Sequence, residues 1–376
     1  MKLYYFSEMP HHEYPDEEGG KYPSLRLAFP NRFFDREKAA SNYQRYLTEY
    51  ELADQVGYDG LMINEHHSTP SCVNVGANMT AAVLGRTTSR AKLLILGNIL
   101  PIEDNPVRMA EQIAMADLIS GGRVLSGFVR GVGVESWWAN SNPVHNRERF
   151  EECHDLIMKC WTEPGPFRWE GQHYHFRHVN PWCLPLQKPH PPIWIPGTAS
   201  PETAVWAGQR GYTYVPFLVP FDTARQLFDF YRQGAAEAGR TVTPDNLGFL
   251  ICAVTADTTE KAREAGKHFV WRMGPTLRGP AEWFSPVGMR SKAGKQFALT
   301  ARPRSLATMS YEELLAAHFI IAGTPDQVAE GFARVQRELG IGHLLLEAQE
   351  SRMDHLTTMR SIELMGAKVI PAIAKL

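Results

Sequence analysis

The chain has 376 residues, of which 44% are apolar and 21% charged, a composition typical of a soluble globular protein with a large core. Its formal net charge of −2 provides no basic excess, so nucleic acid and anionic membrane surfaces are not expected partners. Five scattered cysteines without CxxC spacing predict a reducing compartment and argue against structural zinc. The N-terminus turns polar too early for a signal peptide or a membrane span, and we expect a cytoplasmic protein.

Apolar segments with strand character alternate with helical patterns along the whole chain. Strands are predicted at residues 2–9, 61–63, 93–100, 123–130, 193–195, 212–219, 246–255 and 343–347. Helices are predicted at about residues 36–56, 76–85, 106–120, 146–160, 223–238, 258–272 and 325–339, with others beginning at residue 201 and covering the C-terminus.

Capping residues mark several of the predicted helix ends. Asp35, Asn105 and Ser200 can accept hydrogen bonds from free N–H groups of a first turn, and proline follows Asn105 and Ser200 at the first helical position. Thr324 opens a capping box, and Gly57 is a typical C-terminal stop.

Eight strands alternating with helices, without a long linker, most simply close into an α/β fold of the (β/α)8 TIM-barrel type, with residues 1–376 as a single domain. Residues 274–305, after the seventh strand, lack periodicity and are rich in Gly, Pro, Arg and Ser. Such segments in compact domains are usually lids or binding loops, so we predict a lid insertion there. Active-site groups are expected after the strands, where Glu65, Arg130 and Ser200 fall.

Residues 61–70, LMINEHHSTP, run from an apolar strand straight into Glu65, His66 and His67. Strand side chains alternate between faces, so if the strand persists only one imidazole faces the barrel mouth, and a chelating pair would want His-x-His spacing. The cluster is a candidate proton-handling site, with Glu65 as a partner that orients its neighbours. One alternative is a metal-dependent hydrolase that uses His66 or His67. Another is that each histidine has only a structural role, with its ring hydrogen-bonded to backbone groups.

Ser200 and Thr203 at a helix start form a candidate anion seat, because free N–H groups and the helix dipole attract phosphate. Plain helix capping is the alternative. Arg130 favours the anion seat, because a buried arginine at a strand end needs an anionic partner and a phosphate shared with Ser200 would supply one.

Gly97-Asn98 interrupts a buried strand, which indicates close approach by a ligand or special backbone geometry, with a bulge as the plainer alternative. Trp137 and Trp138 are candidates for the wall of an apolar substrate pocket, or for ordinary core or interface aromatics. No GxGxxG, Walker loop or GxSxG motif is present, so the chain offers no dinucleotide fold and no serine-hydrolase elbow of its own.

The order and spacing of several motifs resemble those of the bacterial luciferase-like, flavin-dependent monooxygenases. The motifs are EHH at 65–67, LGNILPIEDNPVRMAEQIAMADLISGGR at 96–123, GFVRG at 127–131, the helix start at 200–203, and AGTPDQVAEGF at 322–332. The resemblance implies a TIM barrel that binds reduced FMN, which reacts with O2 to give a C4a-hydroperoxyflavin that oxygenates a small organic substrate.

The same resemblance implies roles for individual residues. His66 matches the histidine that supports the oxygen chemistry, and Arg130, Ser200 and Thr203 match the groups that hold the flavin phosphate. Gly97-Asn98 matches a non-prolyl cis peptide beneath the flavin ring.

The remaining expectations concern the substrate pocket and the partners of the protein. Glu8, together with Trp137 and Trp138, is a candidate for the substrate pocket. A separate NAD(P)H-flavin reductase and a homodimer are expected, with no metal.

The chain departs from luciferases at two positions. Val129 replaces a reactive cysteine, which puts long-chain aldehyde chemistry in doubt, and Ala199 replaces an acidic residue, so a flavin contact there is expected only through its backbone. The alternative functions are an F420-dependent oxidoreductase of the same superfamily and a flavin-binding protein without catalysis.

Overall fold

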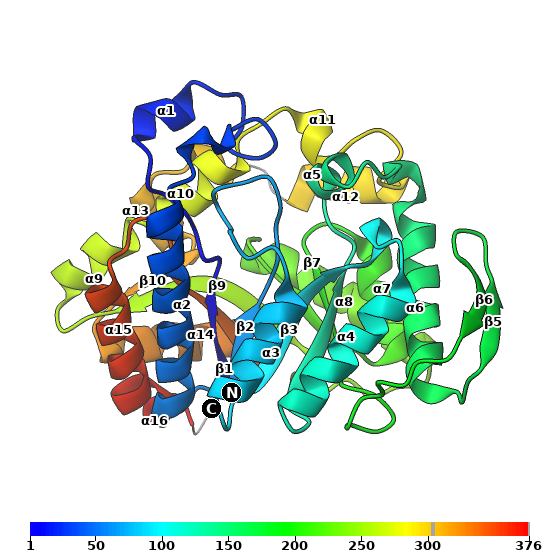
Figure 1. Cartoon of the computed structure of the whole chain (residues 1–376). Helices are drawn as coiled ribbons and strands as arrows, with labels where there is room; N and C mark the ends of the chain where they lie inside the picture. Colours follow the sequence, from blue (N-terminus) through cyan, green and yellow to red (C-terminus); the bar gives the residue numbers. More distant parts are fainter. Residues whose placement is uncertain (302–304, 375–376) are drawn as a thin grey trace.

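A curled parallel sheet lies at the centre of the computed structural model, which describes residues 1–301 and 305–374 (Figure 1). Its nine described strands are β1 (Lys2–Ser7), β2 (Gly60–Ile63), β3 (Lys92–Ile99), β4 (Val124–Val129), β7 (Ile193–Gly197), β8 (Thr213–Pro216), β9 (Gly248–Thr255), β10 (Ile320–Gly323) and β11 (His343–Gln349). They are hydrogen-bonded in the order β10-β9-β11-β1-β2-β3-β4-β7-β8. Parallel bridges from Tyr214 to Leu247 and from Phe217 to Leu250 join β8 to β9, so the sheet curls back on itself.

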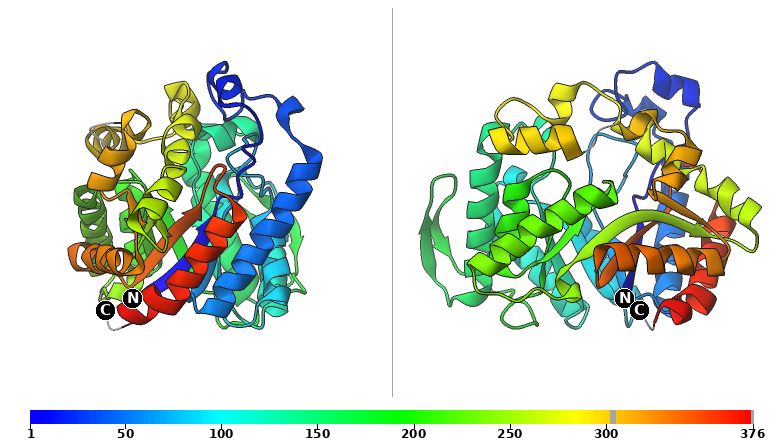
Figure 2. Two further views of the ribbon diagram at one scale, coloured as in Figure 1. Left: turned by 90° about the vertical axis from the view of Figure 1, so that its left-hand side faces the viewer. Right: turned by 180° about the vertical axis from the view of Figure 1, so that it is seen from behind.

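Helices surround this sheet on its outside (Figure 2). The longer ones are α2 (Arg36–Val56), α3 (Ala77–Thr87), α4 (Pro106–Ile119), α6 (Asn146–Thr162), α7 (Pro201–Arg210), α8 (Phe221–Glu237), α9 (Thr259–Gly266), α12 (Lys292–Ala301), α14 (Pro325–Leu339) and α15 (His355–Leu364). Shorter ones are α1 (Asp16–Gly20), α5 (Gly133–Trp138), α10 (Phe269–Met273), α11 (Ala281–Phe284), α13 (Tyr311–Ala316) and α16 (Ile370–Ile373). None of the helices within the described residues is long and apolar enough to span a bilayer.

The two faces of the sheet pack into different apolar clusters. Leu94 and Leu96 of β3 belong to a cluster built only from strand and strand-end residues, which fills the interior of the curled sheet. Their neighbours Leu93 and Ile95 belong to the large cluster that includes the helices. This alternation with a period of two is what a strand covered on both faces requires.

The predicted fold class is confirmed as an α/β fold with a curled parallel sheet, and all eight predicted strands occur in it. The predicted helix ends also form. Asp35 accepts a hydrogen bond from the Lys38 N–H group, Asn105 from that of Arg108, and Gly57 ends α2 with φ of 112°.

Sequence patterns missed three strands and misjudged one segment. β10 adds to the edge of β9, and β5 (Phe167–Glu170) pairs antiparallel with β6 (His175–Val179) outside the main sheet. Residues 274–305 contain a 3-10 turn and two helices, α11 and α12, rather than an unstructured loop, while residues 302–304 of this predicted lid lie outside the described part of the chain. In Figure 1, α11 and α12 cover the end of the sheet opposite the two termini.

Candidate functional site

Two adjoining cavities lie at the C-terminal ends of the strands. The inner cavity has a volume of about 320 Å³ and the outer one of about 600 Å³. Arg130, Ala199, Ser200, Met289 and Arg290 line both of them. Ligands of parallel α/β proteins bind at this end of the sheet, so the joined cavities are the candidate active site.

The inner cavity combines an apolar wall with a small group of ionisable side chains. Its apolar lining includes Phe6, Met62, Leu96, Ile99, Val129, Val132, Phe217, Leu250, Leu277 and Phe284. Its ionisable lining includes Glu8, Arg26, Glu65, His66, Glu135, Arg272 and Glu347. An apolar pocket with a few convergent polar groups is typical of a site for a small organic ligand.

The imidazole of His66 lines the inner cavity and lies between two buried carboxylates. Its Nδ1 is 3.1 Å from Glu135 Oε1, and its Nε2 is 3.7 Å from Glu8 Oε2. Burial raises the pKa of Glu135, but the hydrogen bond from His66 and the charge of Arg26 outweigh it and hold that pKa below its usual range. Arg26 Nη1 lies 3.5 Å from the same Nδ1, so two groups compete for this ring nitrogen. When Nδ1 of a neutral ring donates to Glu135, the nearer of the two, Nε2 is left to accept a proton.

His67 and Glu65 have different roles from His66. The His67 ring stacks on Trp138, with ring centroids 3.5 Å apart, and does not line the cavity. Glu65 lines the cavity, but its carboxylate accepts a hydrogen bond from the Ala77 N–H group at the start of α3, and its nearest histidine nitrogen is His67 Nε2 at 3.9 Å. Of the two neighbours that Glu65 was expected to orient, only His67 lies within ion-pair distance of its carboxylate. A catalytic role of Glu65 stays a prediction.

Glu8 lines the cavity as expected and is held by an arginine that sequence patterns missed. Arg272 Nη2 is 2.6 Å from Glu8 Oε1, and Arg272 Nε is 3.1 Å from Glu347 Oε1. Burial raises the pKa of Glu8, but the charges of Arg272 and His66 outweigh it, so Glu8 is ionised next to His66. Burial and the charge of Glu347 raise the pKa of Glu350 well above its usual range.

The two tryptophans predicted for the substrate pocket lie outside it. Trp137 is 57% exposed, Trp138 is 45% exposed, and neither lines the cavity. The buried residues of α5 are instead those of its first turn, including Glu135, so the tryptophans that end this short helix face outward. The prediction for Trp137 and Trp138 is therefore wrong.

Gly97 of β3 lies in close contact with the backbone of the neighbouring strand β4. The cis peptide bond joins Leu96 to Gly97, one bond before the expected Gly97-Asn98. A Cβ atom on Gly97 would lie 2.5 Å from the Gly127 carbonyl oxygen, so glycine is needed for close approach to β4, next to a shift in strand register. Gly97 lines the cavity, whereas Asn98 is buried and does not, so Asn98 is corrected from a cofactor contact to a strand residue.

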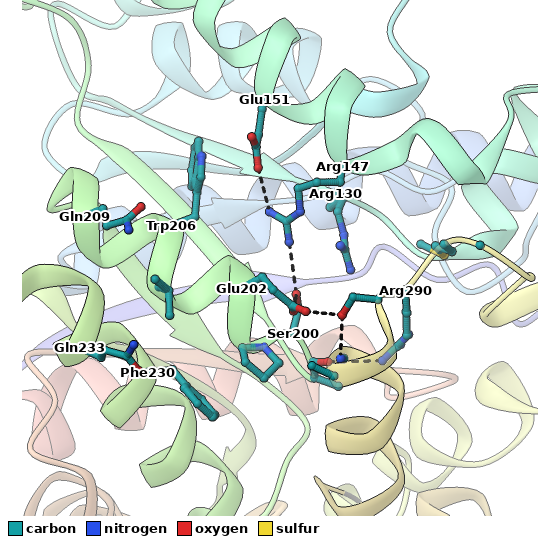
Figure 3. A pocket seen from close by; sticks show the side chains of 18 of the residues that line it. Arg130, Arg147, Glu151, Ser200, Glu202, Trp206, Gln209, Phe230, Gln233 and Arg290 are labelled. Atoms are coloured by element: carbon teal, nitrogen blue, oxygen red, sulfur yellow. Dashed lines mark hydrogen bonds and ion pairs between the residues drawn. The ribbon is translucent and has the colours of Figure 1, made fainter. Parts of the chain in front are cut away.

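The outer cavity contains a cluster of arginines around the start of α7 (Figure 3). Ser200 accepts a hydrogen bond from the Thr203 N–H group. Arg147 Nη2 donates to Thr203 Oγ1 at 2.8 Å and to Ser200 Oγ at 3.3 Å. Arg290 Nη1 is 3.5 Å from the Ala199 carbonyl oxygen. A flavin contact through the Ala199 backbone stays a prediction.

This arginine cluster is short of negative charge. Burial, together with the charges of Arg147 and Arg290, lowers the pKa of Arg130 to about 10. Glu202 and Glu151 offset this only in part. No hydrogen bond or ion pair of the Arg130 side chain occurs within residues 1–301 and 305–374. A bound anion would relieve this repulsion, so the geometry supports the anion seat predicted at Arg130, Ser200 and Thr203.

Two of these arginines were missed by sequence reasoning. Arg147 lies in the first turn of α6, where its position gave no sign that it reaches α7. Arg290 lies in the predicted lid segment, which has no periodicity to indicate the direction of a side chain. The presence of arginines in that segment was the only available signal.

Comparison with known proteins identifies relatives of the chain. The model of the family described as luciferase-like monooxygenase matches residues 25–343. The oxygenase component of a flavin-dependent trigonelline monooxygenase from Acinetobacter baylyi is 25% identical over 246 residues, which are 62% of this chain and 65% of that protein. The alkanal monooxygenase alpha chain of Photobacterium leiognathi is 25% identical over 231 residues, 60% of this chain and 64% of that one. The chain thus spans just under two thirds of these relatives.

Solved structures share the fold over nearly the whole chain. The monooxygenase RslO1 from Streptomyces bottropensis has a TM-score of 0.74 and 21% identity, with 99% of both chains covered. The oxygenating constituent of 3,6-diketocamphane monooxygenase from Pseudomonas putida, in complex with FMN, has a TM-score of 0.71 and 21% identity, with 89% and 94% covered. An F420-dependent secondary alcohol dehydrogenase has a TM-score of 0.70 and 18% identity, with 99% and 98% covered.

Proposed function

The chain belongs to the luciferase-like monooxygenase family, and we propose that it is a flavin-dependent monooxygenase that uses reduced FMN and O2 to oxygenate a small organic substrate. The observation that carries this proposal is the pairing of two sites in adjoining cavities. Arginines gather around the start of α7 at the outer end, and His66 lies between two carboxylates at the inner end. The arginines suit the phosphate of FMN, and the histidine suits the proton transfers of the proposed oxygen chemistry.

The residues of the outer cavity fit the phosphate of FMN. Arg130, Arg147 and Arg290 would bind it together with the hydroxyl groups of Ser200 and Thr203, and the charge of the phosphate would relieve the repulsion among the arginines. Reduced FMN supplies the two electrons that O2 activation requires.

At the inner end, His66 is the proposed catalytic residue. Its Nε2 would accept and return a proton, while Glu135 fixes the ring through Nδ1 and Glu8 stabilises the charged ring. The apolar walls of the cavity would exclude water from the reacting groups. Glu135 acts through His66 and is a positioning residue.

We propose a separate NAD(P)H-flavin reductase as a partner, because the sequence has no dinucleotide-binding motif and one relative is described as an oxygenase component. A homodimer is also proposed. Three apolar side chains on or next to α3 are exposed, namely Val75 (63%), Met79 (75%) and Val83 (41%). They support a contact surface there. The molar mass in solution tests it.

An F420-dependent oxidoreductase is the second candidate, because F420-dependent enzymes are among the proteins of similar fold. Anaerobic titration of the apo-protein with reduced FMN and with reduced F420, side by side, separates the two candidates. We expect saturable binding of FMN and much weaker binding of F420. The reverse order would replace the FMN assignment by F420. The metal-dependent hydrolase has no comparable support, because neither His66 nor His67 belongs to a group of three metal-ligating side chains within the described residues.

The segment at 274–301 is proposed to act as a lid over the flavin. Leu277 and Phe284 line the inner cavity, and Arg290 lines both cavities, so this segment touches the proposed site directly. We expect FMN to slow tryptic cleavage after Arg290 by about tenfold, because bound phosphate orders its guanidinium. Riboflavin, which lacks the phosphate, should protect less. Equal cleavage rates with and without FMN, followed by mass spectrometry, would exclude a lid that closes on the flavin.

A further inference from the structure

A second cluster of ligating side chains lies outside the flavin site, where α6 meets the β5–β6 hairpin. His145 precedes α6, Glu148 lies in its first turn, and His173 lies in the hairpin turn. One ligand atom from each of the three lies within 4.8 Å of the other two. We propose that His145, Glu148 and His173 bind a zinc ion.

The spacing of the three groups suits a tetrahedral metal. His145 Nδ1 is 3.2 Å and His173 Nε2 is 3.1 Å from Glu148 Oε2. Ligands about 2.0 Å from a tetrahedral zinc ion are about 3.3 Å from one another, so small shifts are enough to admit the ion. Two imidazoles and one carboxylate are ligands that zinc prefers, and the fourth position would be open to water.

The hairpin turn is held against α6 by a separate carboxylate, one helical turn after Glu148. Glu152 accepts hydrogen bonds from the backbone N–H groups of Gln172, His173 and Tyr174, at 2.8 to 3.1 Å, and from Trp169 Nε1 at 3.0 Å. These four contacts fix the backbone that carries His173. The side chain of His173 is only 12% exposed, so its direction toward Glu148 is restrained before any metal arrives.

The two rings can change tautomer to bind a metal. The oxygen of Glu148 that they face also accepts a hydrogen bond from Gln172 Nε2 at 3.5 Å. In the metal-free protein, His145 Nδ1 and His173 Nε2 face the same oxygen of Glu148, so each donates a hydrogen bond to it. For the part of the chain that the structure describes, the other ring nitrogens, His145 Nε2 and His173 Nδ1, have no hydrogen-bond partner. Each ring can therefore move its proton to that nitrogen and present a lone pair to the ion.

The zinc ion would join the hairpin to the first turn of α6. Arg147, which reaches Ser200 and Thr203 in the outer cavity, lies in the same turn as Glu148. Binding of the metal would thus reinforce the helix start that carries an arginine of the anion seat. The proposal does not depend on the identity of the flavin.

Calorimetric titration of the tag-free, metal-depleted protein with zinc chloride tests the proposal. We expect one strong zinc site per chain in the wild type. The affinity for zinc should fall by at least 100-fold in His173→Asn and in His145→Asn. His175→Ala is the matched control, because His175 lies in the same hairpin, is 63% exposed and is not part of the cluster, so wild-type affinity is expected. Glu152→Gln should weaken binding by about 10- to 100-fold, since it orients His173 indirectly.

Circular dichroism of each variant confirms that it is folded. Cobalt substitution adds a second measurement, and visible absorption of a tetrahedral ion is expected in the wild type and in His175→Ala but not in His173→Asn. Zinc binding with unchanged affinity in folded His145→Asn and His173→Asn, or no stoichiometric binding by the wild type, would overturn the proposal.

Discussion

Replacing Arg130 with methionine is expected to weaken the binding of FMN by about 100-fold, because it removes a largely buried positive charge from the proposed phosphate. Methionine keeps much of the apolar volume of the arginine side chain, so the cavity wall should persist. Removing one of three repelling arginines should not destabilise the protein, since burial and like charges already lower the pKa of Arg130 to about 10.

Measuring the affinity for riboflavin as well as for FMN shows whether the effect of Arg130→Met depends on the phosphate. It has the same ring system without the phosphate, so its affinity should be nearly equal in the wild type and in Arg130→Met. Gln233→Ala is a matched control, because Gln233 lines the same cavity without a charge, and it should bind FMN normally. Equal losses for riboflavin and FMN would place Arg130 at the ring or in the fold rather than at the phosphate.

His66→Ala is expected to lower the rate of substrate oxygenation by 100-fold or more, because it removes the proposed proton-exchanging group. The affinity for FMN should change little, since the contacts proposed for the phosphate lie at the other end of the site. Incorporation of labelled O2 into product, per reduced FMN consumed, measures the effect once a substrate has been found by screening aldehydes, ketones and aromatic compounds.

His67→Ala is the matched control for this prediction. Its ring stacks on Trp138 outside the cavity, so near wild-type oxygenation is expected. Glu135→Gln should shift the pH profile of oxygenation without abolishing it, because a neutral amide still meets Nδ1 but no longer stabilises the charged ring. If His66→Ala lost FMN binding instead, His66 would be reassigned to anchoring the cofactor.

Local signals predicted much of the fold. Capping residues such as Asp35 and Ser200 specify helix starts through contacts within three residues, and alternating apolar residues specify strands. β5, β6 and β10 are short, and β5 and β6 are only partly buried, so they lack the apolar run that marks a buried strand. Their pairing, with β9 or with each other, depends on tertiary contacts.

Site residues could be predicted where their position in a local pattern indicated their role. They were missed where their role depends on a contact with a residue far away in the sequence. Arg130 and Ser200 could be inferred from a strand end and a helix cap. The contact between Arg272 and Glu8 spans 264 positions and leaves no local pattern. Trp137 and Trp138 were misassigned because α5, at six residues, is too short for its periodicity to show which side faces the cavity.

Rapid mixing of the protein, loaded with reduced FMN, with oxygenated buffer tests the proposed function most directly. We expect reoxidation of the bound flavin to pass through a species that absorbs in the near ultraviolet and differs from both reduced and oxidised FMN. His67→Ala should show the same species. Reoxidation in a single step, at the rate of free flavin and with folded protein present, would contradict the assignment of a flavin-dependent monooxygenase.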